Sequence, residues 1–313
     1  MPPKIAVVTG PTATGKTRLG IELARSLGGE IVSGDSMQIY RGMDIGTAKP
    51  DAAELAAAPH HLIDVAEPSE EWSVSRYVEA ADAAIQDILA RGKLPIVVGG
   101  TGLYIDALVR GTEFGERTRD GELCRAELES RYEEIGGEAM LTELSQVDPE
   151  RAAKLHPADK KRIVRAMEVF LLTGRTMTEH DRETQLKPPK YDAAYIILDF
   201  AERGRLYARI DARVDAMVAA GLFDEVERVF AAGVSHTAAQ AIGYKEAAAA
   251  LAGEITREEA VEAIKRESRR YAKRQLTWLR KRAGALWIRW DDEPDFVSAK
   301  RDSTAFLAAH GII

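Results

Sequence analysis

The sequence predicts an α/β fold, a parallel sheet flanked by helices with a helical insertion, and three observations support this prediction. A glycine-rich loop at residues 10–17 stands between an apolar, β-branched run and an amphipathic helix. Strand-like and helix-like segments alternate through the first hundred residues, as in parallel sheets that carry helices on both faces. A long interval with no convincing strand then begins at about residue 115.

The first strand, loop and helix carry a phosphate-binding pattern. Residues 5–9 have the apolar, β-branched character of a buried parallel strand, and residues 18–26 form a helix with Leu19 and Leu23 on one face. In this context a G-x-x-x-x-G-K-[ST] loop aims backbone N–H groups and a helix N-terminus at a polyphosphate. The pattern predicts a P-loop NTPase-like core, in which Lys16 supplies positive charge to the phosphates and Thr17 a hydroxyl to Mg²⁺. The loop residues are Gly10, Pro11, Thr12, Ala13, Thr14, Gly15, Lys16 and Thr17.

The later elements complete this core. We expect strands at residues 30–33, 62–65 and 94–98, and a helix that Ser73 caps and that runs to about Arg91. Two more strands are predicted at 195–198 and 286–290, before a last helix at 296–310. A phosphate site in such a sheet lies at the carboxyl ends of the strands.

Residues 115–190 are predicted to form a helical insertion domain within a core made of residues 1–114 and 191–313. The insertion should contain helices at 120–135, 137–146, 151–154 and 159–172. The alanine-rich stretches at 52–58 and 247–252 also favour helix.

The composition is that of a globular protein without a membrane span. Apolar residues make up 45% of the chain and charged residues 30%, and no run approaches the length that spans a bilayer. The single cysteine, Cys124, cannot form an internal disulfide, and six scattered histidines do not suggest a zinc site. We expect a cytoplasmic enzyme, and no protein partner is predicted, so we expect a monomer. The net charge of −7 by itself argues against nucleic-acid binding.

Asp35 is the first candidate for chemistry, because it follows the predicted strand at 30–33. A carboxylate at this position, beside the phosphate loop, suits proton abstraction or metal binding. The alternative is a capping role for the segment that follows. The loop continues to Pro50, which is long for a mere connector, and such loops often bind ligands. A second glycine cluster at 99–102 adds the hydroxyl of Thr101 at another strand end.

One feature of nucleotide hydrolases is weak in this chain. A P-loop NTPase normally has an apolar strand that ends in a Mg²⁺-binding aspartate. The strongest candidate strand, 94–98, ends in glycine, and Asp64 after residues 62–63 is a poor substitute. Phosphate binding is therefore better supported than ATP hydrolysis.

A strongly cationic helix is predicted near the C-terminus, at residues 265–282. It holds nine basic residues against one acid, Glu267, for a net charge of +8. Ile264, Tyr271 and Trp278 recur every seven residues and give the helix one apolar stripe. Such segregation in an acidic chain indicates a polyanionic partner, RNA or DNA, although a solvated helix face is the alternative. A weaker cluster in the insertion contains Lys160, Lys161, Arg162 and Arg165.

The motifs together resemble those of the tRNA dimethylallyltransferase family, also called tRNA isopentenyltransferases or IPP transferases, of bacterial type. The phosphate loop alone is shared with many kinases. The stretch 35–50 and the Lys-Arg-Gln-x-Thr-Trp-Leu-Arg sequence at 273–280 are specific to the family. Further similar stretches are 59–64, 99–104 and 162–169, so the resemblance covers nearly the whole chain.

The resemblance implies an activity. The family transfers a dimethylallyl group from dimethylallyl diphosphate to the exocyclic N6 amine of the adenosine at tRNA position 37, next to the anticodon, and releases diphosphate. It implies that residues 10–17 hold the diphosphate, that Lys16 and Arg209 neutralise it as it leaves, and that Thr17 helps to hold the Mg²⁺ cofactor. Asp35 would take the proton from the adenine amine, and Thr101 would contact the substrate near the reacting centre.

The resemblance also implies a set of contacts to the tRNA anticodon stem-loop. These come from the loop after residue 34, from the second glycine cluster, from the insertion and from the basic helix. They are Asp35, Ser36, Met37, Gln38, Thr101, Asp159, Lys160, Lys161, Arg162, Ile163, Lys273, Arg274, Gln275, Leu276, Thr277, Trp278, Leu279 and Arg280.

Two other functions are compatible with parts of the sequence. In a small-molecule P-loop kinase, Asp35 would activate a hydroxyl, but the cationic helix would have no role. In an RNA-binding nucleotide switch without transfer chemistry, Asp35 and the second glycine cluster would have none. The prenyl transferase accounts for all of these features.

Overall fold

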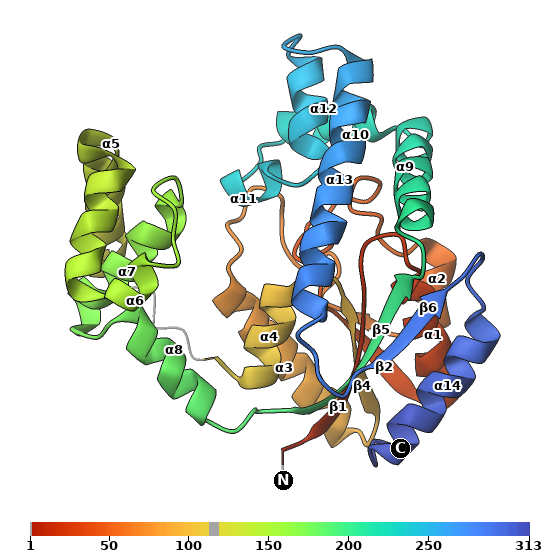
Figure 1. Ribbon diagram of the computed structural model, residues 1–313. Coiled ribbons are helices and arrows are strands. Elements are labelled where there is room, and N and C mark those ends of the chain that lie inside the picture. Colours follow the sequence, from red (N-terminus) through yellow and green to blue (C-terminus); the bar gives the residue numbers. More distant parts are fainter. Residues whose placement is uncertain (1, 113–118) are drawn as a thin grey trace. The chain divides into compact units, whose positions relative to one another are not determined.

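The computed structural model describes residues 2–112 and 119–313, which form two compact units (Figure 1). One unit comprises Met1–Gly111 and Lys190–Ile313, and the other comprises Thr112–Pro189. The boundary between residues 114 and 115 that the sequence suggested lies outside the described residues. Each unit has its own hydrophobic core.

The first unit is built on a six-stranded parallel sheet, which confirms the predicted fold class. The strand order is β3-β2-β4-β1-β5-β6, so β1 lies inside the sheet with β4 on one side and β5 on the other. Since all strands run in the same direction, the loops after β1, β2 and β4 leave the same edge. The strands are β1 (Lys4–Thr9), β2 (Gly29–Ser33), β3 (His60–His61), β4 (Leu94–Gly99), β5 (Asp192–Phe200) and β6 (Leu286–Trp290).

The strand predicted at 62–65 was wrong. The third strand is the two-residue β3, and the chain turns directly after it. Leu62 and Asp64 both have positive φ angles, 63° and 56°, which a strand cannot accommodate. The amides of Asp64 and Val65 instead donate to the carbonyls of Gln38 and Ile39, so this segment supports the loop after β2.

Helices cover both faces of the sheet, and alternate residues of β1 supply the two cores. Ile5 and Val7 pack on the side of α3 and α4, whereas Ala6 and Val8 pack on the side of α1 and α14 (Figure 1). The helices of this unit are α1 (Lys16–Leu27), α2 (Ala52–Ala57), α3 (Val74–Ala90), α4 (Gly102–Arg110), α9 (Arg203–Ala219), α10 (Leu222–Ala231), α11 (His236–Ala239), α12 (Tyr244–Leu251), α13 (Arg257–Leu279) and α14 (Phe296–Ala309).

The second unit is helical. It contains α5 (Arg119–Val147), α6 (Pro149–Ala152), α7 (Lys160–Thr173) and α8 (Met177–Leu186). Gly136 interrupts α5 with φ 81° and ψ 162°, so the two helices predicted at 120–135 and 137–146 meet there. Leu128, Met140 and Ile163 contribute to its core. No helix in the described part of either unit is long and apolar enough to cross a bilayer.

Candidate active site at the carboxyl ends of the central strands

A cavity of about 570 Å³ opens where the loops after β1, β2 and β4 meet. It is the common site of three segments that are far apart in the sequence: the phosphate loop, the loop that begins at Asp35, and the second glycine cluster. Helices α9 and α13 also contribute to its wall. The predicted site residues in its lining are Thr12, Ala13, Gly15, Lys16, Thr17, Asp35, Ser36, Met37, Gln38, Arg274 and Gln275.

The phosphate loop turns sharply into α1. Gly15 precedes the helix with φ 88°, and a Cβ there would lie 2.6 Å from the Phe296 ring, so both the backbone and the space require glycine. Pro11 shapes the inside of the loop, because its carbonyl accepts hydrogen bonds from Thr14 Oγ1 (2.8 Å) and Lys16 Nζ (2.7 Å). Three residues of the loop are buried: Gly10, Pro11 and Thr14.

Two cations and one carboxylate converge in the cavity. Lys16, Arg213 and Asp35 all line it. Burial, followed by the nearby charge of Arg213, lowers the pKa of Lys16 to about 7, and Asp35 acts in the opposite direction. Burial likewise lowers the pKa of Arg213, which Asp35 partly offsets. This arrangement can receive a polyanion beside a potential proton acceptor.

Arg213 was not predicted as a site residue, whereas Arg209 was predicted to neutralise the leaving diphosphate. Both belong to α9, one helical turn apart. Arg213 lines the cavity, whereas Arg209 does not. Arg209 donates from Nε to the carbonyl of Ala13 (3.3 Å) and lies 3.4 Å from Glu293. Arg209 therefore contacts the phosphate loop from outside the cavity lining, and Arg213 is the α9 arginine that lines the cavity.

Thr101 connects the glycine cluster to the segment that carries Asp35. Its Oγ1 accepts a hydrogen bond from the backbone N–H of Ser36 (3.1 Å), and Asp35 Oδ1 accepts one from the N–H of Met37 (2.9 Å). The backbone N–H of Thr101 donates in turn to the carbonyl of Gly34. These bonds hold the Asp35 side chain at the cavity, so Thr101 acts here through the backbone around Asp35.

Tyr271 is a second residue of the cavity wall that sequence reasoning treated only as part of an apolar stripe. Burial, together with the charge of Asp35, raises the pKa of its hydroxyl to about 12. The hydroxyl lies 3.5 Å from the carbonyl oxygen of Gly100. It remains protonated at neutral pH and can donate a hydrogen bond in the cavity.

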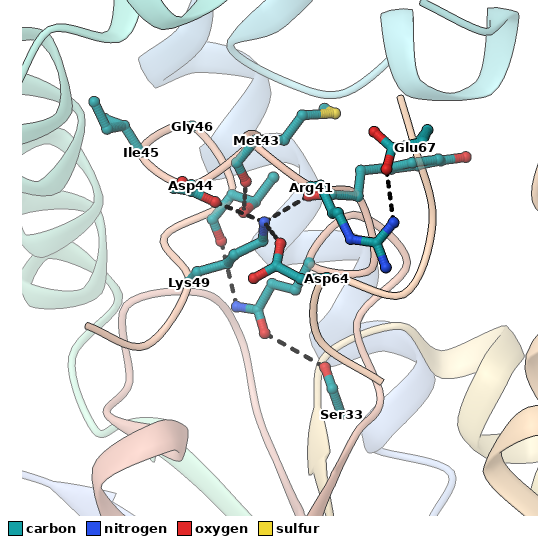
Figure 2. A network of polar contacts seen from close by, with 12 residues as sticks. Ser33, Arg41, Met43, Asp44, Ile45, Gly46, Lys49, Asp64 and Glu67 are labelled. Carbon is teal, nitrogen blue, oxygen red and sulfur yellow. Dashed lines mark hydrogen bonds and ion pairs between the residues drawn. The ribbon is translucent and has the colours of Figure 1, made fainter. Parts of the chain in front are cut away.

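The loop from residue 35 to residue 50 is held from within by Lys49 (Figure 2). The Lys49 side chain is 4% exposed, and Nζ contacts the Tyr40 carbonyl (2.5 Å), Asp44 Oδ1 (2.6 Å) and Asp64 Oδ1 (2.5 Å). Asp64, which the sequence suggested as a weak metal ligand, is thus the partner of Lys49. It is not part of the cavity lining.

Glu225 on α10 holds the same loop from outside. Its side chain accepts hydrogen bonds from the consecutive N–H groups of Asp44 (2.9 Å), Ile45 (2.8 Å) and Gly46 (3.0 Å). Tyr244 Oη donates a fourth (2.5 Å). Glu225 is only 1% exposed, so the four donors compensate a buried charge.

Removing this carboxylate should destabilise the protein. In Glu225→Ala, the buried Tyr244 hydroxyl and three part-buried N–H groups lose their acceptor, at about 1–3 kcal/mol for each that stays unsatisfied, so we expect a loss of about 3 kcal/mol or more. Urea unfolding measures this loss. Glu227→Ala, an exposed change on the same helix, should stay within about 0.5 kcal/mol. Equal stabilities of the two variants would show that Glu225 does not hold the loop.

The predicted cationic helix, α13, is partly neutralised by ion pairs. Lys265 pairs with Asp215 (2.7 Å), Arg269 with Asp211 (2.5 Å) and Arg282 with Asp106. Arg266 and Arg270 both lie near Glu267. In the part of the chain that the structure describes, the basic residues of this segment without an ion pair are Lys273, Arg274, Arg280 and Lys281. The cationic face is therefore shorter than the sequence suggested.

The side chains of α13 that were expected to contact RNA differ in burial. Leu276 and Leu279 pack in the core, at 1% and 0% exposure, because they lie on the sheet side of the helix. Gln275 is also buried, and Trp278 donates to Asp106 Oδ2 (2.6 Å). The exposed members are Lys273, Arg274, Thr277 and Arg280.

The expected contact residues of the insertion also differ in burial. The Ile163 side chain is fully buried in the core of its unit. Asp159 Oδ2 accepts from the His156 N–H, and Lys160 pairs with Glu133 (2.6 Å). Lys161 and Arg162 are exposed at the start of α7 and stay candidates.

Comparison with known proteins identifies the family. The profile described as IPP transferase matches residues 38–282, and the one described as isopentenyl transferase matches residues 3–67. The chain belongs to the IPP transferase family. It is 48% identical over 310 residues to a tRNA dimethylallyltransferase of Shouchella clausii, covering 99% of this chain and 98% of that protein. Over 292 residues it is 49% identical to tRNA dimethylallyltransferase 1 of Citrifermentans bemidjiense, covering 92% of each.

Solved structures of the family share the fold. A tRNA isopentenylpyrophosphate transferase of Bacillus halodurans is 42% identical, with a TM-score of 0.71 over 98% of this chain and 96% of the other. A eukaryotic dimethylallyltransferase, described as acting on tRNA, is 29% identical. Its TM-score is 0.82 over 99% of this chain and 79% of the other. Both agree with the P-loop-type sheet.

Proposed function

We propose that this chain is a tRNA dimethylallyltransferase, which moves a dimethylallyl group from dimethylallyl diphosphate to the N6 amine of the adenosine next to the anticodon. The observation that carries the proposal is the convergence of Lys16, Arg213 and Asp35 in one cavity. The transfer reaction needs cationic groups that bind the diphosphate and a base that accepts the amine proton. The family membership supports the same substrates.

The transfer step follows from these groups. The amine nitrogen forms a bond to the allylic carbon as the bond from that carbon to the diphosphate oxygen breaks, and the electron pair of this bond leaves with the diphosphate. Lys16, Arg213 and the N–H groups of the phosphate loop stabilise the developing charge. Asp35 accepts the proton that the nitrogen loses.

The cofactor we propose is Mg²⁺. Thr17 lines the cavity beside Lys16, and a hydroxyl is a hard oxygen ligand of the kind that Mg²⁺ prefers. Because Mg²⁺ commonly takes only one or two protein ligands and completes its shell with phosphate oxygens and water, Thr17 fits this role. When bound, the ion would supply further neutralisation of the diphosphate.

Mass analysis of tRNA nucleosides tests the proposal. After incubation with dimethylallyl diphosphate and Mg²⁺, unmodified tRNA should yield an adenosine that carries a dimethylallyl group on N6. Phosphate release from ATP at enzyme-like rates, with no prenylated nucleoside, would instead support a P-loop kinase or hydrolase.

The exposed basic residues of α13 should hold the RNA through its phosphates. Replacing Lys273 and Arg274 with Ala should weaken binding of anticodon stem-loops of all sequences alike. The slope of log K against log salt should fall by roughly one unit per lost contact. Arg270→Ala is a matched control, since Glu267 already pairs with it. If the double replacement leaves the salt slope unchanged, these residues form a solvated face that does not contact the RNA phosphates.

The low pKa of Lys16 predicts a proton uptake on donor binding. At pH 8 the free protein has largely lost the Lys16 proton, whereas a bound diphosphate favours the ammonium and raises its pKa. Affinity for dimethylallyl diphosphate should therefore decrease as the pH rises above about 7. Calorimetry at pH 8 in buffers of different ionisation enthalpy should show more uptake for wild type than for Lys16→Arg, whose guanidinium keeps its proton. Equal uptake in both proteins would contradict this assignment.

A further inference from the structure

Gln275 joins the two loops that form the donor side of the cavity. The loops follow β1 and β4, which are neighbours in the sheet with Thr9 opposite Gly99. Gln275 Oε1 accepts a hydrogen bond from the backbone N–H of Thr12 (3.0 Å), and Nε2 donates one to the Gly100 carbonyl (2.9 Å). The residue is 6% exposed, so both ends of its amide are used inside the protein.

The surroundings are shaped for this amide. A Cβ on Gly100 would lie 2.2 Å from Gln275 Nε2, so glycine at this position leaves the space that the amide fills. One planar group supplies an acceptor to the first loop and a donor to the second. Methionine matches glutamine in length but offers neither a strong donor nor a strong acceptor, and asparagine is one methylene shorter.

The two loops carry the groups that the reaction needs. Thr12 belongs to the phosphate loop, between Pro11, which bonds Lys16, and Ala13, which lines the cavity. Gly100 is followed by Thr101, which bonds the backbone beside Asp35. A single side chain therefore fixes the spacing between the diphosphate site and the segment of the proposed base.

We infer that Gln275 is a positioning residue for the donor diphosphate. Its place in the Lys-Arg-Gln sequence suggests a contact to RNA, and we infer that it makes none. This inference rests on the proposed function. Lys273 and Arg274 lie two and one residues before it on the exposed face of α13. Lys273 is thus exposed to solvent, whereas Gln275 two residues later bonds the phosphate loop.

Two variants break this link by independent routes. Gln275→Met removes both hydrogen bonds, and Gly100→Ala places a methyl group where Nε2 lies. Each should raise the KM for dimethylallyl diphosphate, and the Kd for inorganic diphosphate, by about tenfold. Each should leave the Kd for the anticodon stem-loop and its salt slope within about twofold of wild type. Because both changes break the same link, the double variant should lose little more than either single variant.

The matched control is Lys273→Ala, which should weaken RNA binding and leave diphosphate binding unchanged.

The outcomes separate this inference from the proposed function. Inorganic diphosphate binding is measured without catalysis, so it reports on Gln275 even if no prenyl transfer occurs. Weakened RNA binding with unchanged diphosphate affinity in Gln275→Met would overturn the inference. So would full additivity of the two changes, or unchanged affinities for both ligands in variants whose thermal unfolding shows that they are folded.

Discussion

Replacing Asp35 with Asn should slow prenyl transfer by about 10²–10⁴-fold, the usual contribution of a positioned base. Asparagine keeps the size of the side chain and an oxygen for the Met37 N–H, so the local backbone should persist. It cannot accept the amine proton at neutral pH. Single-turnover prenylation of an anticodon stem-loop measures the loss, and the affinity for that RNA should stay near the wild-type value.

Two further variants complete this test. Asp35→Ala should be at least as slow, since it also lacks the oxygen that holds the Met37 amide. Asp51→Asn changes an exposed carboxylate that caps α2, where asparagine caps equally well, and it should keep the wild-type rate. A rate for Asp35→Asn within about twofold of wild type would show that another group takes the proton.

The second large effect is expected at Arg213. Arg213→Gln removes a cation from the wall of the cavity and should lower the transfer rate by about 10²–10³-fold, as the loss of one preorganised stabilising donor does. Arg209→Gln should cost much less, because Arg209 donates to the Ala13 carbonyl and is partly exposed. Single-turnover rates of the two variants compare the arginines directly. A larger loss at Arg209 than at Arg213 would reverse this assignment.

The parts of the site that local sequence determines were predictable. The phosphate loop needs only its own glycines, its lysine and the strand and helix around it. The β6 strand at Leu286–Trp290 and the start of α3 after Ser73 also followed from local patterns. In each case the signal and the structure involve the same few residues.

Local sequence patterns could not show whether Arg209 or Arg213 lines the cavity. They are four residues apart on α9, so they share a helix face, and only the packing of α9 against the cavity distinguishes them. The sequence signal for Arg213 was its place as the second arginine of Arg-Ile-x-x-Arg. Burial on α13 was more accessible to sequence reasoning, because the spacing of Ala272, Leu276 and Leu279 is helical and places them on one buried side.

Weak patterns explain the remaining errors. The β3 strand has two residues, too few for any periodicity, and the apolar residues that follow it at 62–65 give the stronger strand pattern. Helix α8 was not predicted, because Met177–Leu186 is mostly polar. Its signal was the capping box of Thr176 and Glu179, which marks a helix start independently of apolar spacing.

The most direct test of transfer chemistry counts the diphosphate released against the prenyl groups found on RNA. With dimethylallyl diphosphate, Mg²⁺ and an anticodon stem-loop that contains the target adenosine, we expect one diphosphate for each prenyl group. Without RNA, or with inosine in place of that adenosine, we expect neither product, because inosine lacks the exocyclic amine. Diphosphate release that continues without RNA modification, or prenylation of the inosine-containing RNA at the same rate, would contradict transfer to the adenosine amine.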